Sequence, residues 1–484
     1  MSIKSISKNS SILLTGQVAC AAIIFIRTGI MARYLSPIDY GLIAAVTSIL
    51  GVTFFFGDLG LGTAAIQKKN ITLTQQNTLF WANSLCGFVV AVLICILAPM
   101  ITMFAKDDRC YSITVFMSAV FLINGLGVQH LSKLKRDLRF KNIALSDLTA
   151  TFLSSIIGII LSLKGYKYWS LVWCQVTYSF FLNGVYWLYA KWLPGVGEWN
   201  SDTKKMLSFG FDVSVLNVFS RITRNFDQVL ITRISGLSSL GIYSRAISLI
   251  ALVNNQLRLS VFSSAFPLLA KYQGNNDDFN RTYIDFIKLL VLPTSLAGGF
   301  FIFHADSLIA IYLGKNWSTV APYLKILGIS CFVLPVVTAL DQIPLAKGIS
   351  RLYMGIGLSR GAIKIITITI GTFLYGAIGC AWGYVLGDVF SILPSYFIAS
   401  RAAPIDTATI IPSVFLPLTI ALASGYFSFI LCKVCLFASQ HIVICFIEST
   451  LLYLIIYLVI YYVCSIKFNR FMINLPGCFN AKYF

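Results

Sequence analysis

The sequence consists largely of apolar stretches of about 20 residues separated by short polar connections. A helix of that length, rising about 1.5 Å per residue, crosses the ~30 Å hydrocarbon core of a bilayer. Hydrophobic residues make up 57% of the 484-residue chain and charged residues only 11%, too few to cover the surface of a water-soluble protein of this size. We therefore predict an all-α polytopic membrane protein.

Apolar windows predict about fourteen transmembrane helices. They lie near residues 11–32, 41–63, 79–103, 111–131, 144–163, 168–190, 208–232, 242–266, 284–304, 321–344, 353–375, 377–399, 410–432 and 442–464. Lys and Arg concentrate in the connections on the side of the N-terminus, for example between Lys133 and Lys141. By the positive-inside rule, both termini are predicted to lie in the cytoplasm. The net charge of +19 is spread over these connections, so we expect no nucleic-acid binding.

The sequence predicts no metal site and no bound cofactor. Cys432 and Cys435 form a single C-x-x-C pair inside an apolar segment, and no second pair accompanies it. His130, His304 and His441 are far apart in the sequence. No nucleotide-binding motif is present, so direct use of ATP is not expected.

A shift of 200 residues brings two parts of the chain into register. Asp39–Leu42 then falls on Ser239–Ile242, and Arg27 falls on Asp227. Six predicted helices precede the second copy, so both copies enter the membrane with the same polarity. Such parallel repeats are related by an axis along the membrane normal and occur in alternating-access transporters.

The repeat predicts two similar six-helix lobes followed by two extra helices. The predicted parts are an N-terminal six-helix lobe (1–192), a cytoplasmic linker (193–207), a C-terminal six-helix lobe (208–400), and two additional helices with a cytoplasmic tail (401–484).

The apolar stretch from Phe209 to Ile234 carries two arginines and an aspartate in its interior. Its polar residues recur at steps of three and four and so share one helix face: Ser214, Asn217, Arg221, Arg224 and Gln228. Charges at this depth are costly and usually face a bundle interior or a watery cavity. The stripe therefore predicts a polar path through the membrane.

Three segments resemble the Wzx-type polysaccharide flippases. Arg33–Gly41 resembles the R-x-L-x-P-x-D-[FY]-G turn after their first helix. Phe56–Lys68 resembles the F-x-D-L-G-L-x-x-A-x-I-Q segment of their colanic-acid-type branch, and Leu240–Ala246 resembles the L-G-x-Y-x-x-A that opens their second half. The resemblance extends over nearly the whole chain.

The resemblance implies the fold of the multidrug/oligosaccharidyl-lipid/polysaccharide exporters, in which two six-helix lobes surround a central cavity and two C-terminal helices follow. It also implies that the chain moves undecaprenyl-diphosphate-linked oligosaccharide repeat units across a bacterial inner membrane, for capsule, exopolysaccharide or O-antigen assembly. The implied partners are that lipid-linked glycan and membrane lipid, with a polysaccharide polymerase and a chain-length regulator as further candidates. A proton gradient, a sodium gradient and consumption of the product by the polymerase all remain open as the energy source.

Two alternatives follow from the same sequence. A multidrug exporter of the same fold would favour acidic and aromatic cavity residues for cationic drugs, whereas the deep charges here are mainly basic. A membrane-embedded polysaccharide polymerase would be expected to show a large extramembrane loop or a metal-binding D-x-D motif, and this chain has neither.

Arg221 and Arg224 are the first candidates to bind an anionic head group, because the guanidinium fork grips phosphate and stays protonated. Pairing with Asp227 and snorkelling to the interface are the alternatives. Asn217 and Gln228 would line the same cavity.

Four further charges lie in the second half. Arg258 would receive the entering diphosphate or act as an interfacial anchor. Lys364 and Asp388 each lie eleven residues into neighbouring helices, about 16 Å deep, and would form an ion pair or a switch opened by phosphate or a proton. Arg360 shares the helix face of Lys364.

Besides Asp388, three charges are interpreted as ion-pair or gating residues. Asp227 and Arg27 are repeat counterparts that would face one another or contact substrate. Asp58 lies in a family-like segment and would serve in capping, in a gate, or in ion coupling.

Overall fold

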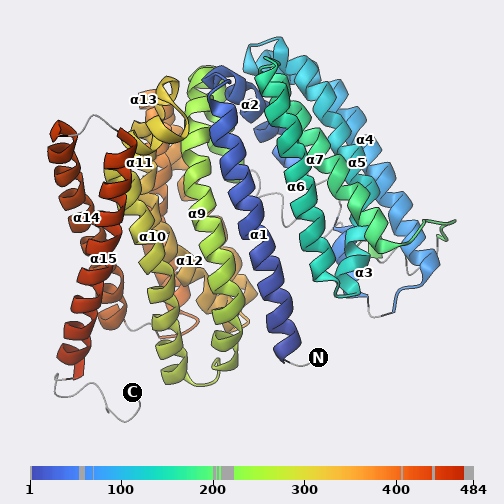
Figure 1. Ribbon diagram of the computed structural model, residues 1–484. Coiled ribbons are helices and arrows are strands. Elements are labelled where there is room, and N and C mark those ends of the chain that lie inside the picture. Colours follow the sequence, from blue (N-terminus) through green and yellow to red (C-terminus); the bar gives the residue numbers. More distant parts are fainter. Residues whose placement is uncertain are drawn as a thin grey trace. The chain divides into compact units, whose positions relative to one another are not determined.

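The computed structural model describes residues 3–53, 60–68, 70–199, 203, 206–208, 223–404, 407–438 and 442–473. These residues are almost entirely helical, and no strand occurs among them (Figure 1). Ten of the described helices are long and apolar enough to cross a membrane. The predicted all-α, multi-pass membrane fold is confirmed, while the count of fourteen spans stays a prediction.

The longest helix, α13 (Ser350–Ser400), consists of two helices. Its 51 residues would extend about 75 Å as one straight helix, more than twice the hydrocarbon thickness. Tyr375 and Gly376 leave the helical conformation, and Gly376 has a φ of 60°, which favours glycine. This turn lies where the predicted spans 353–375 and 377–399 meet.

The first compact unit comprises residues 1–248 and 361–387. Its helices are α1 (Ile3–Ala32), α2 (Pro37–Thr53), α3 (Leu61–Gln67), α4 (Leu73–Ala105), α5 (Arg109–Arg136), α6 (Phe140–Leu163), α7 (Tyr168–Ala190), a helical segment 223–234, and parts of α9 (Gly236–Lys271) and α13. Helix α5 packs against α4 and α7, and α6 packs against α1 and α7 (Figure 1). Gly87 and Gly125 let α4 and α5 approach closely, since a Cβ on either would lie within 3 Å of a backbone oxygen of the other helix.

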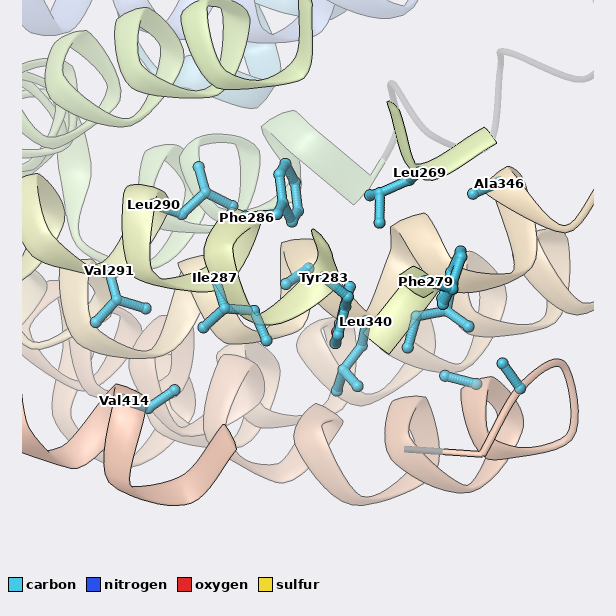
Figure 2. Close-up of a cluster of buried hydrophobic side chains, with 14 of the residues drawn as sticks. Leu269, Phe279, Tyr283, Phe286, Ile287, Leu290, Val291, Leu340, Ala346 and Val414 are labelled. Carbon is cyan, nitrogen blue, oxygen red and sulfur yellow. The ribbon is translucent and has the colours of Figure 1, made fainter. Parts of the chain in front are cut away.

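The second compact unit comprises residues 249–360 and 388–484. It contains the remainder of α9 and α13 together with α10 (Asn276–Tyr312), η1 (Lys315–Trp317), α11 (Val320–Gly328), α12 (Ser330–Ala346), α14 (Thr407–Ala438) and α15 (Ile442–Ile473). Figure 2 shows its core, in which Phe279 and Leu290 of α10 pack near Leu340 and Val414. Lipid tails are as apolar as these side chains, so this core is stabilised by close packing rather than by exclusion of water.

Hydrogen bonds tie the last two helices to α10. The hydroxyl groups of Tyr453 and Tyr457 donate to the carbonyl oxygens of Leu296 (2.7 Å) and Leu292 (2.9 Å). The His304 ring nitrogen Nε2 and the Ser428 hydroxyl of α14 form a buried hydrogen bond of 3.0 Å. Among the described residues, α14 and α15 are the helices that follow α13. The predicted lobe boundaries at 192, 208 and 400 stay predictions.

The first part of the predicted linker is bound to α4. Residues 192–199, which we call the strap, have no helical structure and run along the start of α4. The side chains of Asn77, Thr78 and Trp81 donate to the carbonyl oxygens of Val196 (3.2 Å), Glu198 (2.9 Å) and Gly195 (3.0 Å). The strap thus helps to bury a polar helix start, where Asn77 and Thr78 are each less than a tenth exposed.

Candidate functional site

The family-like turn at residues 33–41 begins α2 with a capping box. The Ser36 backbone N–H donates to the Asp39 carboxylate (2.8 Å), and the Asp39 N–H donates to the Ser36 hydroxyl (3.3 Å). Pro37 occupies the first helical position, where its missing N–H leaves no bond unmade. The serine, proline and aspartate of this motif therefore fix where α2 starts.

The glycine of the same motif lies where α2 crosses α9. A Cβ added to Gly41 would overlap the Leu237 carbonyl oxygen, and a Cβ added to Gly241 would overlap the Pro37 carbonyl oxygen. The two contacts exchange under a shift of 200 residues, the shift that aligns the sequence with itself. We call this contact the α2–α9 crossing. Its local two-fold symmetry agrees with a parallel repeat.

An arginine and a tyrosine lie beside the crossing. The Arg245 guanidinium lies 4.3 Å from the centroid of the Tyr40 ring, a cation–π contact, and Tyr40 is buried. Arg27 also acts electrostatically on the Tyr40 hydroxyl and donates to the Cys174 sulfur (2.9 Å). Tyr40 and Arg245 belong to the family-like segments Arg33–Gly41 and Leu240–Ala246, but no role for either residue was predicted from the sequence.

Asp227 is buried and bound by Tyr243. The Tyr243 hydroxyl donates to one carboxylate oxygen (2.7 Å), and the Gln228 backbone N–H donates to the other (2.8 Å). No ion pair between Asp227 and Arg27 is found among the residues that the structure describes; Tyr243 donates to the carboxylate, and the Cys174 sulfur accepts from the arginine. The interpretation of both charges as ion-pair or gating residues stays a prediction. Nothing in the sequence pattern predicts Tyr243 as this partner, since it lies sixteen residues away across a turn.

Lys364 belongs to the same unit as Asp227. Its ammonium lies 3.3 Å from the centroid of the Tyr384 ring and acts electrostatically on Asp227. Asp388 belongs to the other compact unit, so its predicted pairing with Lys364 stays a prediction.

Arg360 forms an ion pair in the second unit. Its guanidinium lies 2.6 Å from the carboxylate of Asp341, which is buried on α12. Asp388, also buried, acts electrostatically on Arg360. Asp341 was not predicted as the partner of Arg360, because nothing in the sequence places α12 against α13 at this depth.

Arg224 is exposed and forms no ion pair with any residue that the structure describes. It lies ten residues before Ile234, about 15 Å along the helical segment and thus near the middle of a bilayer. Gln228, one turn further on, is half-buried. Pairing of Arg224 with Asp227, one of the two alternatives, is therefore not seen.

The remaining predicted site residues cannot be placed. Asn217, Arg221 and Asp58 lie outside the described residues. Arg258 lies on α9, but its side chain is outside the described part.

The fold is similar to that of the solved lipid II flippase MurJ in an inward closed conformation. The TM-score is 0.75 over 96% of this chain and 99% of that chain, at 15% sequence identity, so the likeness concerns the fold. The chain is thus a polytopic membrane protein whose fold is similar to that of MurJ. Residues 30–322 match the family of polysaccharide biosynthesis proteins, and the chain belongs to that family.

Two curated relatives agree with this family. The chain is 24% identical to the teichuronic acid biosynthesis protein TuaB of Bacillus subtilis (strain 168), over 77% of each protein. It is 22% identical to the lipopolysaccharide biosynthesis protein WzxC of Escherichia coli (strain K12), over 78% of this chain and 79% of that protein. The resemblance to the Wzx-type polysaccharide flippases is confirmed.

Proposed function

We propose that the protein is a flippase for undecaprenyl-diphosphate-linked oligosaccharide repeat units, acting in the assembly of capsule, exopolysaccharide or O-antigen in a bacterial inner membrane. The family, the names of TuaB and WzxC, and the fold shared with a lipid II flippase support this proposal. We further propose alternating access with both termini in the cytoplasm, in line with the distribution of basic loops.

The exposed Arg224 at membrane depth is the observation that carries the proposal. A diphosphate and its sugars cannot cross hydrocarbon unaided, whereas the polyprenyl tail is stable there. A flippase must therefore offer a fixed positive charge partway across the membrane. Arginine stays protonated in any such environment and binds phosphate with paired hydrogen bonds.

Two further cations support an anion-attracting path. Lys364 lies over the Tyr384 ring and Arg245 over the Tyr40 ring. A cation–π contact holds the cation in position and leaves its formal charge intact. Such a path would repel the cationic substrates of many multidrug exporters, which makes that alternative the weaker one.

Arg360 would act differently from Arg224. Its guanidinium is already paired with Asp341, so a substrate phosphate must exchange with that carboxylate to reach it. This exchange would make Arg360 a switch rather than a permanent binding group.

Complementation of a strain that lacks the gene tests both the function and the site. Surface polysaccharide, lipid-linked intermediates and protein level are measured for the wild type, Arg224→Ala and Arg224→Lys. Loss of a charged hydrogen bond, worth about 1.5–3 kcal/mol, should slow translocation by roughly 10- to 150-fold, and lysine should restore part of it. The matched control is Arg233→Ala, since Arg233 is also exposed but lies near the end of the same helical segment.

Two outcomes would contradict parts of the proposal. Normal polymer in the deletion strain, where no second flippase is present, would refute the function. Full activity of Arg224→Ala at normal protein level would refute the role of Arg224 and leave the function standing.

A further inference from the structure

The strap has a fixed inner face and an apolar outer face. On the inner face, Trp192 is buried with its ring centroid 4.9 Å from that of His130. On the outer face, three large apolar side chains remain exposed, Leu193 by 81%, Val196 by 88% and Trp199 by 64%. Since α4 side chains bind three carbonyl oxygens of the strap, its backbone holds these side chains outward.

The strap lies at the level where α4 enters the membrane. The 33 residues of α4 extend about 50 Å, so a ~30 Å hydrocarbon layer centred on this helix begins about 10 Å after Leu73. Asn77 and Trp81, which bind the strap, lie about 6 Å and 12 Å after Leu73. Tryptophan side chains are enriched at this interface. The outer face of the strap is therefore at the depth of lipid head groups and the adjoining acyl carbons.

Two lysines lie beside the strap. The Lys133 ammonium lies 5.7 Å from the centroid of the Trp192 ring. Lys191 directly precedes the strap, is exposed, and forms no ion pair with any residue that the structure describes. Glu198, near the other end of the strap, is its acidic residue. The charge next to the start of the strap is therefore positive and complements an anion.

The strap backbone offers further hydrogen-bond donors. Its carbonyl oxygens at Gly195, Val196 and Glu198 accept from α4. The backbone N–H groups of residues 195–199 have no acceptor among the described residues. Backbone N–H groups next to an ammonium group suit the oxygens of a phosphate, which accept charge-assisted hydrogen bonds.

We propose that the strap and Lys191 bind the head group of an anionic phospholipid, in the leaflet on the side where α4 begins. The phosphate accepts from Lys191 and from the strap N–H groups, while the acyl chains lie against Leu193 and Val196. A zwitterionic lipid would bring a second cation next to Lys191, so the anionic lipid is preferred. A water-soluble protein fits this face less well, because the apolar side chains lie at the depth of lipid. The site binds membrane lipid whether or not the proposed function is correct.

Quenching of tryptophan fluorescence by brominated lipid tests the site. The purified full-length protein is reconstituted in phosphatidylcholine vesicles that contain either dibrominated phosphatidylglycerol or dibrominated phosphatidylcholine. The difference between the wild type and Trp199→Phe isolates the signal of Trp199 among the eight tryptophans. Half-maximal quenching of this signal should need roughly 5-fold less phosphatidylglycerol than phosphatidylcholine, the effect of one lysine near an anionic head group.

Two substitutions separate the charge of the site from its apolar contacts. Lys191→Gln should make the two lipids quench equally, because the apolar contacts of the strap remain. The matched control is Lys164→Gln, which changes an exposed lysine beyond the opposite end of α7 and should keep the preference for phosphatidylglycerol. Val196→Glu should weaken quenching by both lipids. The unfolding temperature of each variant shows that these changes are local.

Three results would overturn the site. A Trp199→Phe protein quenched like the wild type by both lipids would place Trp199 outside the lipid. If Trp199 were then also shielded from iodide, another protein chain or a second copy would be the occupant. Equal quenching of the wild type by the two lipids would refute the anionic head group. A preference for phosphatidylglycerol that persists in Lys191→Gln would refute the assignment of Lys191.

Discussion

Replacement of Gly41 by alanine should destabilise the α2–α9 crossing. The added Cβ would overlap the Leu237 carbonyl oxygen, which belongs to the backbone and cannot rotate away. The two helices must therefore separate by roughly 1 Å, and overpacking of this kind costs about 1–3 kcal/mol. A cost of that size changes the ratio between intact and separated crossings by about 5- to 150-fold.

A matched control separates this effect from the general effect of alanine in a helix. Gly184 lies inside α7, and a Cβ there would meet nothing within 4 Å. Gly184→Ala should raise the free energy of unfolding by about 0.5–1 kcal/mol, because glycine loses more backbone entropy on folding. The two substitutions are therefore expected to have opposite signs in thermal unfolding of the detergent-solubilised protein.

Substitution of Gly241, the symmetric counterpart of Gly41 at the α2–α9 crossing, provides a stricter test. Gly241→Ala should cost about as much as Gly41→Ala, and the double substitution should cost clearly less than the sum, since one separation relieves both overlaps. Equal stabilisation by Gly41→Ala and Gly184→Ala would refute the close crossing. Strict additivity of the two substitutions at the crossing would show that they act independently.

Two further substitutions test contacts in the first compact unit. Tyr243→Phe should lower the free energy of unfolding by about 1.5–3 kcal/mol, because the buried Asp227 carboxylate loses a donor; an unchanged unfolding temperature would show that the hydrogen bond does not contribute. Gly197→Ala should release the strap, because its Cβ would lie 2.8 Å from the Thr78 hydroxyl and 2.9 Å from the Thr78 Cα. Faster proteolytic cleavage within residues 192–199 would show this release, and wild-type resistance would contradict it.

The helical fold could be predicted from the sequence because the bilayer restricts the choice so strongly. A lipid-exposed segment must satisfy its own backbone hydrogen bonds, so each apolar stretch of spanning length becomes a helix. The turn inside α13 was predicted for the same reason, since 51 residues cannot span the membrane once. The strap was missed because it is far too short to span a membrane and its hydrogen bonds come from α4, more than a hundred residues earlier.

The candidate site was predicted only in part. Deep charges such as Asp227 and Lys364 stand out in an apolar sequence, so their importance could be inferred. Their partners could not, because Tyr243 and Tyr384 are ordinary residues for a membrane helix and are brought near by packing across turns.

The symmetry of the α2–α9 crossing suggests how the chain originated. If a half-length ancestor had formed a homodimer, this glycine would have met its own copy on the two-fold axis, and every mutation near the axis would have acted twice. Fusion of the two halves freed each position to change by itself. The pair formed by Tyr40 and Arg245 corresponds, 200 residues away, to the buried Leu240 and Ala45. One half therefore carries a cation next to the axis and the other half an apolar residue, so the two similar halves differ in charge at their point of contact.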